Sequence, residues 1–230
     1  MINKDTKIYC SFAEQAGNTG CIRFNSAFEH YGLNAIYKSF SVKSIKDAVC
    51  AARTLNFSGF AVTMPFKKEV LDCVDRLSQE VREIGAANTV VNEQGVLKAY
   101  NTDYIAAKTM LKGVNMVNVP SLLTGNTRKE LVILGNGGYA DAVRYAADLL
   151  RIGHITITRE RWSTISGIRD SIVYNCTPVP NIEVDKTNRY IDCLVSTKTG
   201  KELSEIQARH QFLLYTGLDL PTNDEKNAIC

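Results

Sequence analysis

The chain has 230 residues, of which 45% are hydrophobic and 22% charged, as in an ordinary globular protein of one large or two small domains. Its formal net charge of +3 is too small to indicate a nucleic-acid partner, and no apolar run reaches the ~18 residues that a membrane helix needs. Residues 1–7 lack the apolar core of a signal peptide, so we expect a cytoplasmic protein with neither a nucleic-acid nor a membrane partner.

Seven cysteines are scattered along the chain without a C-x-x-C pair, and several of them lie in apolar segments. This usage predicts reduced, mostly buried thiols in a cytosolic protein. The three histidines are far apart in the sequence and none belongs to a cluster with the spacing of metal ligands. We therefore predict no metal site.

Strand-like and helix-like segments alternate along the first half, which is typical of an α/β fold with largely parallel sheets. The expected strands are 7–12, 35–40 and 59–64, and the expected helices are 21–31, 44–55 and 67–77. Gly32 is expected to end the first helix and Ser44 to cap the second. Residues 89–92 and 96–99 flank Glu93-Gln94-Gly95 and predict a β-hairpin.

The second half repeats the alternation after a helix at 104–111, which is expected to lead into a second domain, and a polar loop at 115–128. Its expected elements are strand 131–134, helix 139–150 and strands 155–158 and 172–175. Only about ten residues separate Arg161 from the last of these strands, although a complete dinucleotide-binding half would place a helix and a strand there. We therefore expect a shortened sheet of four or five strands.

The residues between strand 131–134 and the following helix are Gly135-Asn136-Gly137-Gly138-Tyr139-Ala140, a G-x-G-x-x-A turn. The first glycine allows a tight turn, the second lets the backbone approach a pyrophosphate, and the alanine allows close packing of helix and strand. The N-terminus of the helix attracts phosphate. Because a strand precedes this motif and a helix follows it, the turn predicts nucleotide binding.

The next strand ends in Thr158-Arg159-Glu160-Arg161, where an NAD-preferring site usually has an acid for the ribose hydroxyl. Arginine at this point favours the 2′-phosphate of NADP. The alternative is that Arg159 and Arg161 are solvated turn charges, partly neutralised by Glu160.

Two further segments place polar groups at strand ends, as α/β enzymes do when they bind a polyol or an acid. The first is Val62-Thr63-Met64-Pro65-Phe66-Lys67, and the second is Gly85-Ala86-Ala87-Asn88-Thr89 followed by Tyr100-Asn101-Thr102-Asp103. Taken alone, each group has an ordinary explanation. Lys67 could be an ordinary surface lysine, and Asp103 could simply cap the helix that follows it. Asn88 and Thr89 could simply form a turn.

Taken together and in this order, the segments V-T-x-P-F-K, G-A-x-N-T and N-T-D resemble the signature of the shikimate dehydrogenase family. The resemblance implies that Lys67 and Asp103 are catalytic and flank the reacting hydroxyl. The implied substrate-binding residues are Asn18, Thr63, Asn88, Thr102 and Gln207, the last of these in a closing helix that packs on the first domain. The implied cofactor-binding residues are Gly135, Gly137, Gly138, Ala140, Thr158, Arg159 and Thr177.

The sequence departs from the family pattern at several positions. The serines of the carboxylate-binding S-x-S-P turn fall on Asn18 and Gly20, counting back from Asn25, and Ala61 replaces an asparagine. Pro180 stands where relatives have the glycine of a T-P-x-G turn. The chain is therefore most similar to the shikimate dehydrogenase-like subgroup, and its binding of the substrate carboxylate and of NADP is expected to be weakened.

From these observations we predict two α/β domains around a cleft. Residues 1–103, with the closing helix at 199–230, form a substrate domain, and residues 104–198 form a trimmed Rossmann-like NADP domain. The resemblance implies reversible NADP-dependent oxidation of shikimate or a related ring alcohol, as in aromatic amino acid and chorismate biosynthesis, by a monomer or homodimer. The alternatives are a catalytically impaired small-molecule or nucleotide-binding protein, or an interaction module, of the same descent, and an enzyme with another substrate.

Overall fold

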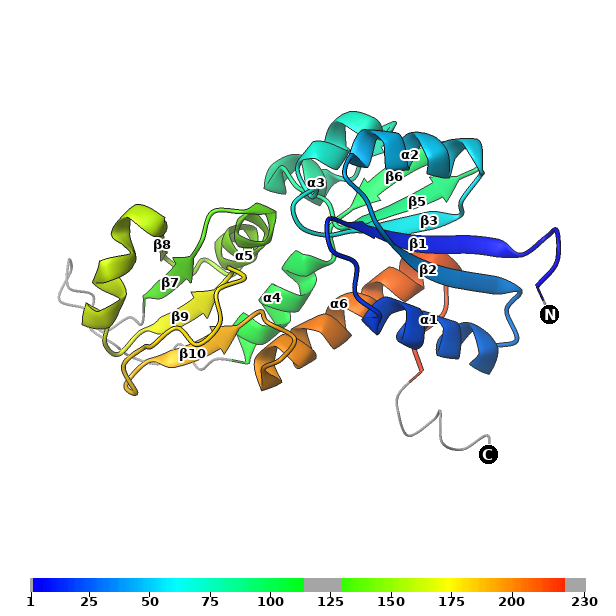
Figure 1. Ribbon diagram of the computed structural model, residues 1–230. Helices are drawn as coiled ribbons and strands as arrows, with labels where there is room; N and C mark the ends of the chain where they lie inside the picture. The colour runs from blue at the N-terminus through cyan, green and yellow to red at the C-terminus, as the bar shows by residue number, and fades with distance from the viewer. Residues whose placement is uncertain (1, 114–129, 222–230) are drawn as a thin grey trace. The chain divides into compact units, whose positions relative to one another are not determined.

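The computed structural model describes residues 2–113 and 130–221. The chain divides into two compact units, Met1–Thr102 with Ala208–Cys230, and Asp103–Gln207. Each unit has one β-sheet with helices packed against it (Figure 1). The α/β prediction is confirmed, whereas the assignment of substrate and cofactor to the two units stays a prediction. The loop predicted at 115–128 lies outside the described residues.

The sheet of the first unit has six strands in the order β2-β1-β3-β5-β6-β4. These strands are β1 (Lys7–Ala13), β2 (Ala35–Ser41), β3 (Gly59–Val62), β4 (Arg76–Leu77), β5 (Thr89–Glu93) and β6 (Val96–Tyr100). β1 pairs in parallel with β2 and β3, whereas β5 is antiparallel to both of its neighbours. The predicted hairpin is confirmed, and Gln94 and Gly95 form its turn with φ angles of 56° and 94°.

Two hydrophobic layers cover this sheet, one on each face (Figure 1). α2 (Ile45–Thr54), the 3₁₀ helix η1 (Glu69–Cys73) and α3 (Gln79–Ile84) pack on one face, around Phe60 and Val90. α1 (Thr19–His30) and the C-terminal part of α6 (Lys198–Thr216) pack on the other face, around Phe28 and Phe212. The predicted cap of α2 is confirmed, because the Ser44 hydroxyl accepts a bond of 3.2 Å from the Asp47 amide.

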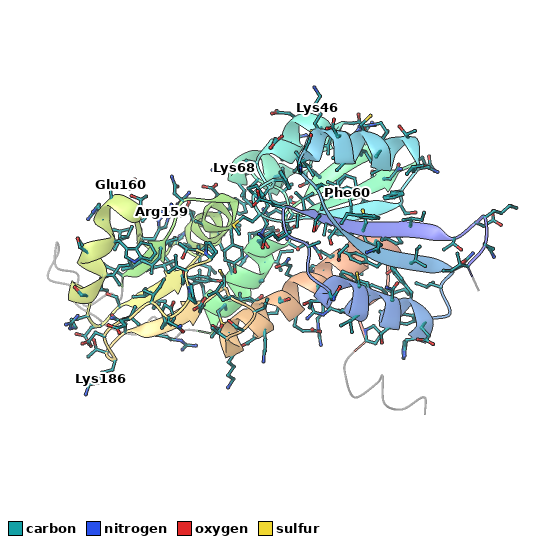
Figure 2. The ribbon with its side chains drawn as sticks, viewed as in Figure 1. Lys46, Phe60, Lys68, Arg159, Glu160 and Lys186 are labelled. Carbon is teal, nitrogen blue, oxygen red and sulfur yellow. The ribbon has the colours of Figure 1, made fainter. Side chains whose placement is uncertain are left out.

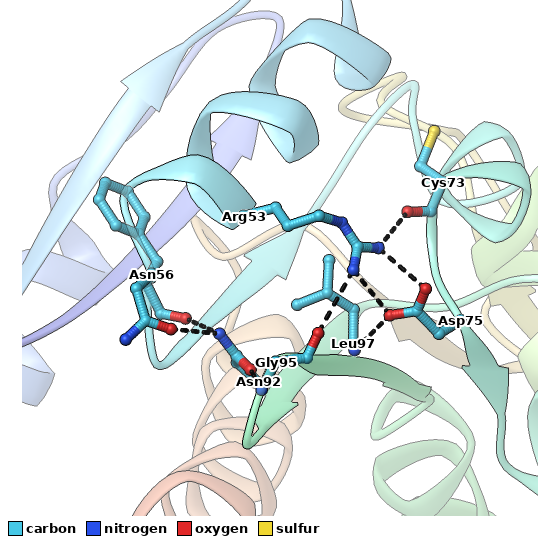
Figure 3. Close-up of polar contacts among 8 residues, drawn as sticks. Arg53, Asn56, Cys73, Asp75, Asn92, Gly95 and Leu97 are labelled. Atoms are coloured by element: carbon cyan, nitrogen blue, oxygen red, sulfur yellow. Dashed lines mark hydrogen bonds and ion pairs between the residues drawn. The ribbon is translucent and has the colours of Figure 1, made fainter.

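An ion pair fixes α2 to the outer strands of this sheet, as Figure 3 shows. Nη1 and Nη2 of Arg53 donate to the two carboxylate oxygens of Asp75 at 2.9 and 3.2 Å. One of these oxygens also accepts from the Leu97 amide at 2.7 Å. The hydrogen bond from Arg53 and the bond from the Leu97 amide lower the pKa of Asp75. The pair therefore joins α2, the segment before β4, and β6.

The helix predicted over 67–77 is wrong. The chain makes turns to Lys68 and then the short helix η1, and Arg76–Leu77 pairs in parallel with β6 as strand β4. The backbone on both sides of β4 is also held by β6, because the amides of Asp75 and Ser78 donate to the carbonyls of Leu97 and Ala99. Pairing with a strand about twenty residues away therefore overrides the local helical pattern. α3 was not predicted.

The second unit has a four-stranded parallel sheet in the order β10-β9-β7-β8. Its strands are β7 (Leu131–Leu134), β8 (His154–Ile157), β9 (Ile172–Asn175) and β10 (Arg189–Asp192). α4 (Asp103–Lys112), α5 (Gly138–Leu149) and the first part of α6 cover one face, and the 3₁₀ helix η2 (Arg159–Gly167) covers the other. The predicted shortening is confirmed, because η2 occupies the connection from β8 to β9.

The prediction of mostly buried cysteines needs correction. Of the six cysteines in the described residues, only Cys10 is buried, while Cys50 is exposed and the others are partly exposed. Within α6, Phe212 is fully buried whereas the neighbouring Leu213 is 44% exposed. Across residues 2–113 and 130–221, no helix is long and apolar enough to cross a membrane.

Candidate functional site

The polar segments of the first unit meet at one edge of its sheet. The Val62 amide donates to the Asn88 carbonyl at 2.8 Å, and the Asn88 amide donates to the Tyr100 carbonyl at 3.1 Å. The Ala87 amide donates to the Lys67 carbonyl at 2.8 Å. The three motif segments, which are separate in the sequence, are therefore joined by backbone hydrogen bonds at the ends of β3, β5 and β6.

Asn88 is the centre of the buried hydrogen-bond network at this edge. Its Nδ2 donates to Oγ1 of Thr102 at 2.9 Å, and its Oδ1 accepts from the Thr102 amide at 2.8 Å and from the Thr89 hydroxyl at 2.9 Å. Asn101 donates from Nδ2 to the carbonyl of Ala86 at 2.9 Å. All four polar side chains are at most 1% exposed. A network as buried and as connected as this holds its members in fixed positions.

Gln211 is a member of this network that sequence reasoning missed. Its Nε2 donates to the Thr89 hydroxyl at 3.0 Å and to the Asn88 carbonyl at 3.3 Å, and the residue is 4% exposed. Gln207, which was predicted to bind substrate, lies one helical turn earlier, is partly exposed and belongs to the other unit. The sequence contains one signal for Gln211, because it is a polar residue on the otherwise apolar side of the closing helix.

The two predicted catalytic residues have different surroundings. Lys67 is partly buried next to the buried Phe66. The neighbouring Lys68, which Figure 2 labels, is exposed. Asp103 directly follows Thr102, is fully buried and begins α4. Burying a carboxylate costs free energy that a simple surface helix cap does not incur. Asp103 therefore differs from a surface helix cap, and its catalytic role stays a prediction. Thr63, predicted to bind substrate, is exposed.

The predicted carboxylate-binding positions lie at the start of α1. Asn18 is exposed and precedes the helix, and its carbonyl accepts from the Ile22 amide at 3.1 Å. Gly20 has ordinary helical backbone, so a positive φ is not what distinguishes it. Instead, a Cβ added at Gly20 would lie 2.9 Å from Cε1 of Tyr37, a ring that packs on Phe24. The glycine is needed for close packing.

In the second unit, the glycine turn connects β7 to α5 as predicted, and its phosphate-binding role stays a prediction. Gly135 has a φ of 105°, and a Cβ there would lie 2.7 Å from Cγ2 of Thr177. Gly137 is the N-cap of α5, and a Cβ there would meet no atom within 4 Å, so the backbone is open to a ligand. Ala140 is fully buried against the sheet. No side chain of the described residues caps this helix, so no side-chain cap bonds its first backbone amides.

Thr177 is placed beside this turn by Asn175 at the end of β9. The amide and the hydroxyl of Thr177 both donate to Oδ1 of Asn175, at 2.9 and 2.7 Å. The Thr177 hydroxyl in turn accepts from the Val179 amide at 3.2 Å. The T-P-V-P segment is therefore held as a tight turn despite the proline at position 180.

Charged side chains follow β8, as predicted for a cofactor phosphate. Arg159 and Arg161 are exposed at the start of η2, and Figure 2 shows Arg159 with the neighbouring Glu160. Glu160 accepts from the hydroxyl of Thr158. This hydrogen bond is the main cause of the lowered pKa of Glu160, with a smaller contribution from Arg159. An anion therefore stands beside both residues that were predicted to bind the 2′-phosphate.

Arg144, in α5, supports the same region and was not predicted. It forms an ion pair with Asp141 and donates to Oδ1 of Asn136 at 3.0 Å and to the hydroxyl of Thr156 at 3.3 Å. Its guanidinium therefore joins the glycine turn to β8. In the part of the chain that the structure describes, no group of His, Cys, Asp and Glu side chains is arranged to hold a metal ion.

The chain is similar to known proteins. Residues 21–90 match the family described as Shikimate dehydrogenase substrate binding domain. A shikimate dehydrogenase (NADP(+)) of Alkaliphilus metalliredigens is 32% identical over 211 residues, which cover 89% of this chain and 66% of that protein. The chain belongs to the shikimate dehydrogenase family.

Two further members of the shikimate dehydrogenase family are informative. A shikimate dehydrogenase-like protein of Haemophilus influenzae is 36% identical over 143 residues, 62% of this chain and 49% of that protein. A solved shikimate 5-dehydrogenase-like protein is 25% identical with a TM-score of 0.78, and the match covers 99% of this chain and 97% of that chain. In these sequence matches, the chain spans about half to two thirds of the length of its curated relatives.

Proposed function

We propose that this protein is an NADP-dependent oxidoreductase that interconverts shikimate, or a close ring alcohol, and the corresponding ketone. The observation that carries the proposal is the joining of the Lys67, Asn88 and Thr102 segments at one sheet edge by buried hydrogen bonds. The name of the Alkaliphilus relative includes both the substrate and NADP(+). The direct experiment is to follow NADPH formation by absorbance with shikimate and NADP⁺, with NAD⁺ and quinate as alternatives.

Lys67 and Asp103 are proposed to assist the transfer of the proton to and from the reacting hydroxyl. An ammonium group near the substrate oxygen stabilises the alkoxide that develops as the hydride leaves. We therefore assign Lys67 as the charged donor to the substrate oxygen, with Asp103 sharing the proton transfer.

Asn88 and Thr102 are proposed to position the ring hydroxyls together with Thr63 and Gln207, and Asn18 is proposed to contact the substrate carboxylate. NADP, when bound, would accept or donate the hydride. The glycine turn, the N-terminus of α5 and Thr177 would hold its phosphates, and Thr158 and Arg159 would hold its 2′-phosphate. The open backbone at Gly137 and the uncapped helix N-terminus support this assignment.

Cofactor preference is expected to depend on Arg159 and Glu160 in opposite senses. Arg159→Ala should weaken NADP binding by about 1.5–3 kcal/mol through loss of a charge-assisted hydrogen bond, and leave NAD binding nearly unchanged. Glu160→Gln should strengthen NADP binding relative to NAD, because it removes an anion beside the phosphate and keeps a side chain of similar size. Titrating both cofactors by NADPH or NADH fluorescence measures these changes. Equal losses for both cofactors in Arg159→Ala would refute the assignment.

Substrate affinity is expected to be low because the serine pair is absent. Two hydroxyl donors are each worth about 0.5–1.5 kcal/mol, so we expect a shikimate KM at or above ~1 mM. Asn18→Ser should lower this KM, since residue 18 is exposed. Adding Gly20→Ser should instead cost about 1–3 kcal/mol of stability, because Tyr37 has to move. Steady-state kinetics and thermal unfolding of both variants provide the test, and a micromolar wild-type KM would contradict it.

A second candidate function is binding without catalysis. The observation that favours it is the four-stranded sheet of the second unit, in which η2 takes the place of further Rossmann elements. Thermal shift with NADP, NAD and shikimate separates the two candidates when combined with the activity assay. Stabilisation by ligand without turnover supports the binding protein, whereas turnover supports the enzyme.

A further inference from the structure

Two cysteines of the second unit lie next to each other at the ends of neighbouring strands. β9 and β10 are parallel, and their last register pair joins Asn175 to Asp192. The Cys193 amide continues this ladder by donating to the Asn175 carbonyl at 3.2 Å. The next pair in register is therefore Cys176 and Cys193.

The side chains of this pair share one face of the sheet. Asn175 donates from Nδ2 to Oδ1 of Asp192 at 3.2 Å, so these two side chains point to the same face. Successive side chains of a strand alternate between faces, which places both cysteines together on the opposite face. In agreement, both thiols contribute to the raised pKa of the Tyr174 hydroxyl, an effect dominated by burial, and Cys176 packs on the cluster containing Tyr174 and Ile191.

Their spacing is suited to a covalent link. Neighbouring strands lie about 4.7–4.9 Å apart, and a disulfide spans Cα–Cα distances of roughly 4.4–6.8 Å. Both residues are partly exposed, so a small reagent has access to them. The other four cysteines of the described residues, Cys10, Cys21, Cys50 and Cys73, belong to the first unit.

We propose that Cys176 and Cys193 form a thiol modification site that reacts with small disulfides of the glutathione disulfide class. The thiolate of one cysteine attacks the reagent, forms a mixed disulfide and releases one glutathione thiol. The second cysteine, as a thiolate, then attacks the bound sulfur of the first and releases the other glutathione thiol. The protein loses two electrons and two protons, and the reagent is reduced to two thiols.

The position of the pair connects it to the glycine turn. A Cβ at Gly135 would lie 3.5 Å from the Cys176 carbonyl oxygen and 2.7 Å from the Thr177 methyl group. The backbone of Gly135 is therefore packed closely against residues 176 and 177. A disulfide also requires Cβ atoms to approach to about 3.5–4.5 Å, which draws the two strand ends together. We expect this movement to displace Thr177 and weaken NADP binding, a consequence that rests on the proposed function.

The first test maps the bond and does not depend on the function. Purified full-length protein is incubated with glutathione disulfide, the remaining thiols are alkylated, and the peptides are analysed by mass spectrometry without reduction. We expect a Cys176–Cys193 crosslinked peptide that disappears after reduction. In Cys193→Ser, Cys176 should carry glutathione instead, and Cys50→Ser, which removes the exposed thiol of the first unit, should leave the crosslink unchanged.

Two outcomes of this first test would contradict the proposed modification site. One is alkylation of both cysteines after treatment, and the other is stable glutathione on each of them without a crosslink. The second test measures NADP binding before and after oxidation, where we expect about a tenfold loss, equivalent to 1.4 kcal/mol, that reduction restores. An unchanged affinity in crosslinked protein refutes the link to the glycine turn. Absence of NADP binding in the reduced protein refutes the proposed function and leaves the mapped crosslink standing.

Discussion

Replacing Lys67 with alanine is expected to lower turnover of shikimate by about 10²–10⁴-fold, the usual contribution of a group that assists proton transfer. The reason is that the substrate oxygen loses its charged donor while the alkoxide develops. The backbone carbonyl of Lys67, which accepts from the Ala87 amide, is unaffected by the substitution, so the network around Asn88 should stay intact. Initial rates at saturating NADP⁺, with circular dichroism as a folding check, measure the effect.

The neighbouring lysine offers a matched control. Lys68 is exposed, so Lys68→Ala removes the same charge from the next residue of the chain and should keep nearly full turnover. If both variants lose activity equally, the effect comes from the net charge of this loop. If neither loses activity, Lys67 has no part in the chemistry.

Replacing Phe212 with alanine is expected to destabilise the first unit by about 3–5 kcal/mol, the cost of deleting a fully buried phenylalanine. The ring packs with Phe24 and Phe28 of α1, at centroid distances of 6.1 and 5.7 Å. For a chain of this length, this corresponds to a drop in Tm of roughly 6–20 °C. The measurement is thermal unfolding followed by far-ultraviolet circular dichroism.

The adjacent Leu213 is the control for this prediction. Because it is 44% exposed, Leu213→Ala should change Tm little. The single tryptophan of the chain, Trp162, packs in the second unit, so its fluorescence follows that unit separately. Equal Tm losses in Phe212→Ala and Leu213→Ala would contradict the packing described here.

The elements that the sequence predicts correctly depend on local chemistry. Ser44 caps a helix by bonding an amide three residues ahead, and Gln94-Gly95 closes a hairpin between strands that are adjacent in the chain. Both signals lie within a few residues and do not depend on the rest of the fold. The strand, glycine turn and helix at residues 131–149 were recognised for the same reason.

The features that were missed depend on partners far away in the chain. β4 forms because β6 pairs with it, Gln211 bonds residues more than 120 positions earlier, and Gly20 is required by the ring of Tyr37. No local pattern contains these partners. Within the candidate site, the motifs identified Asn88 and Thr102 as polar groups at strand ends, but only the fold shows that they bond each other.

The closing helix has a consequence for how the chain is made. The residues that complete the core of the first unit, Phe212 and Tyr215 among them, follow the whole second unit in the sequence. During synthesis, residues 1–102 emerge long before these partners, so the part of the sheet face that α6 covers stays exposed to water until residues 208–216 have been made. A fragment ending at Thr102 is therefore expected to aggregate, and an isolated first unit would need residues 208–221 attached through a linker.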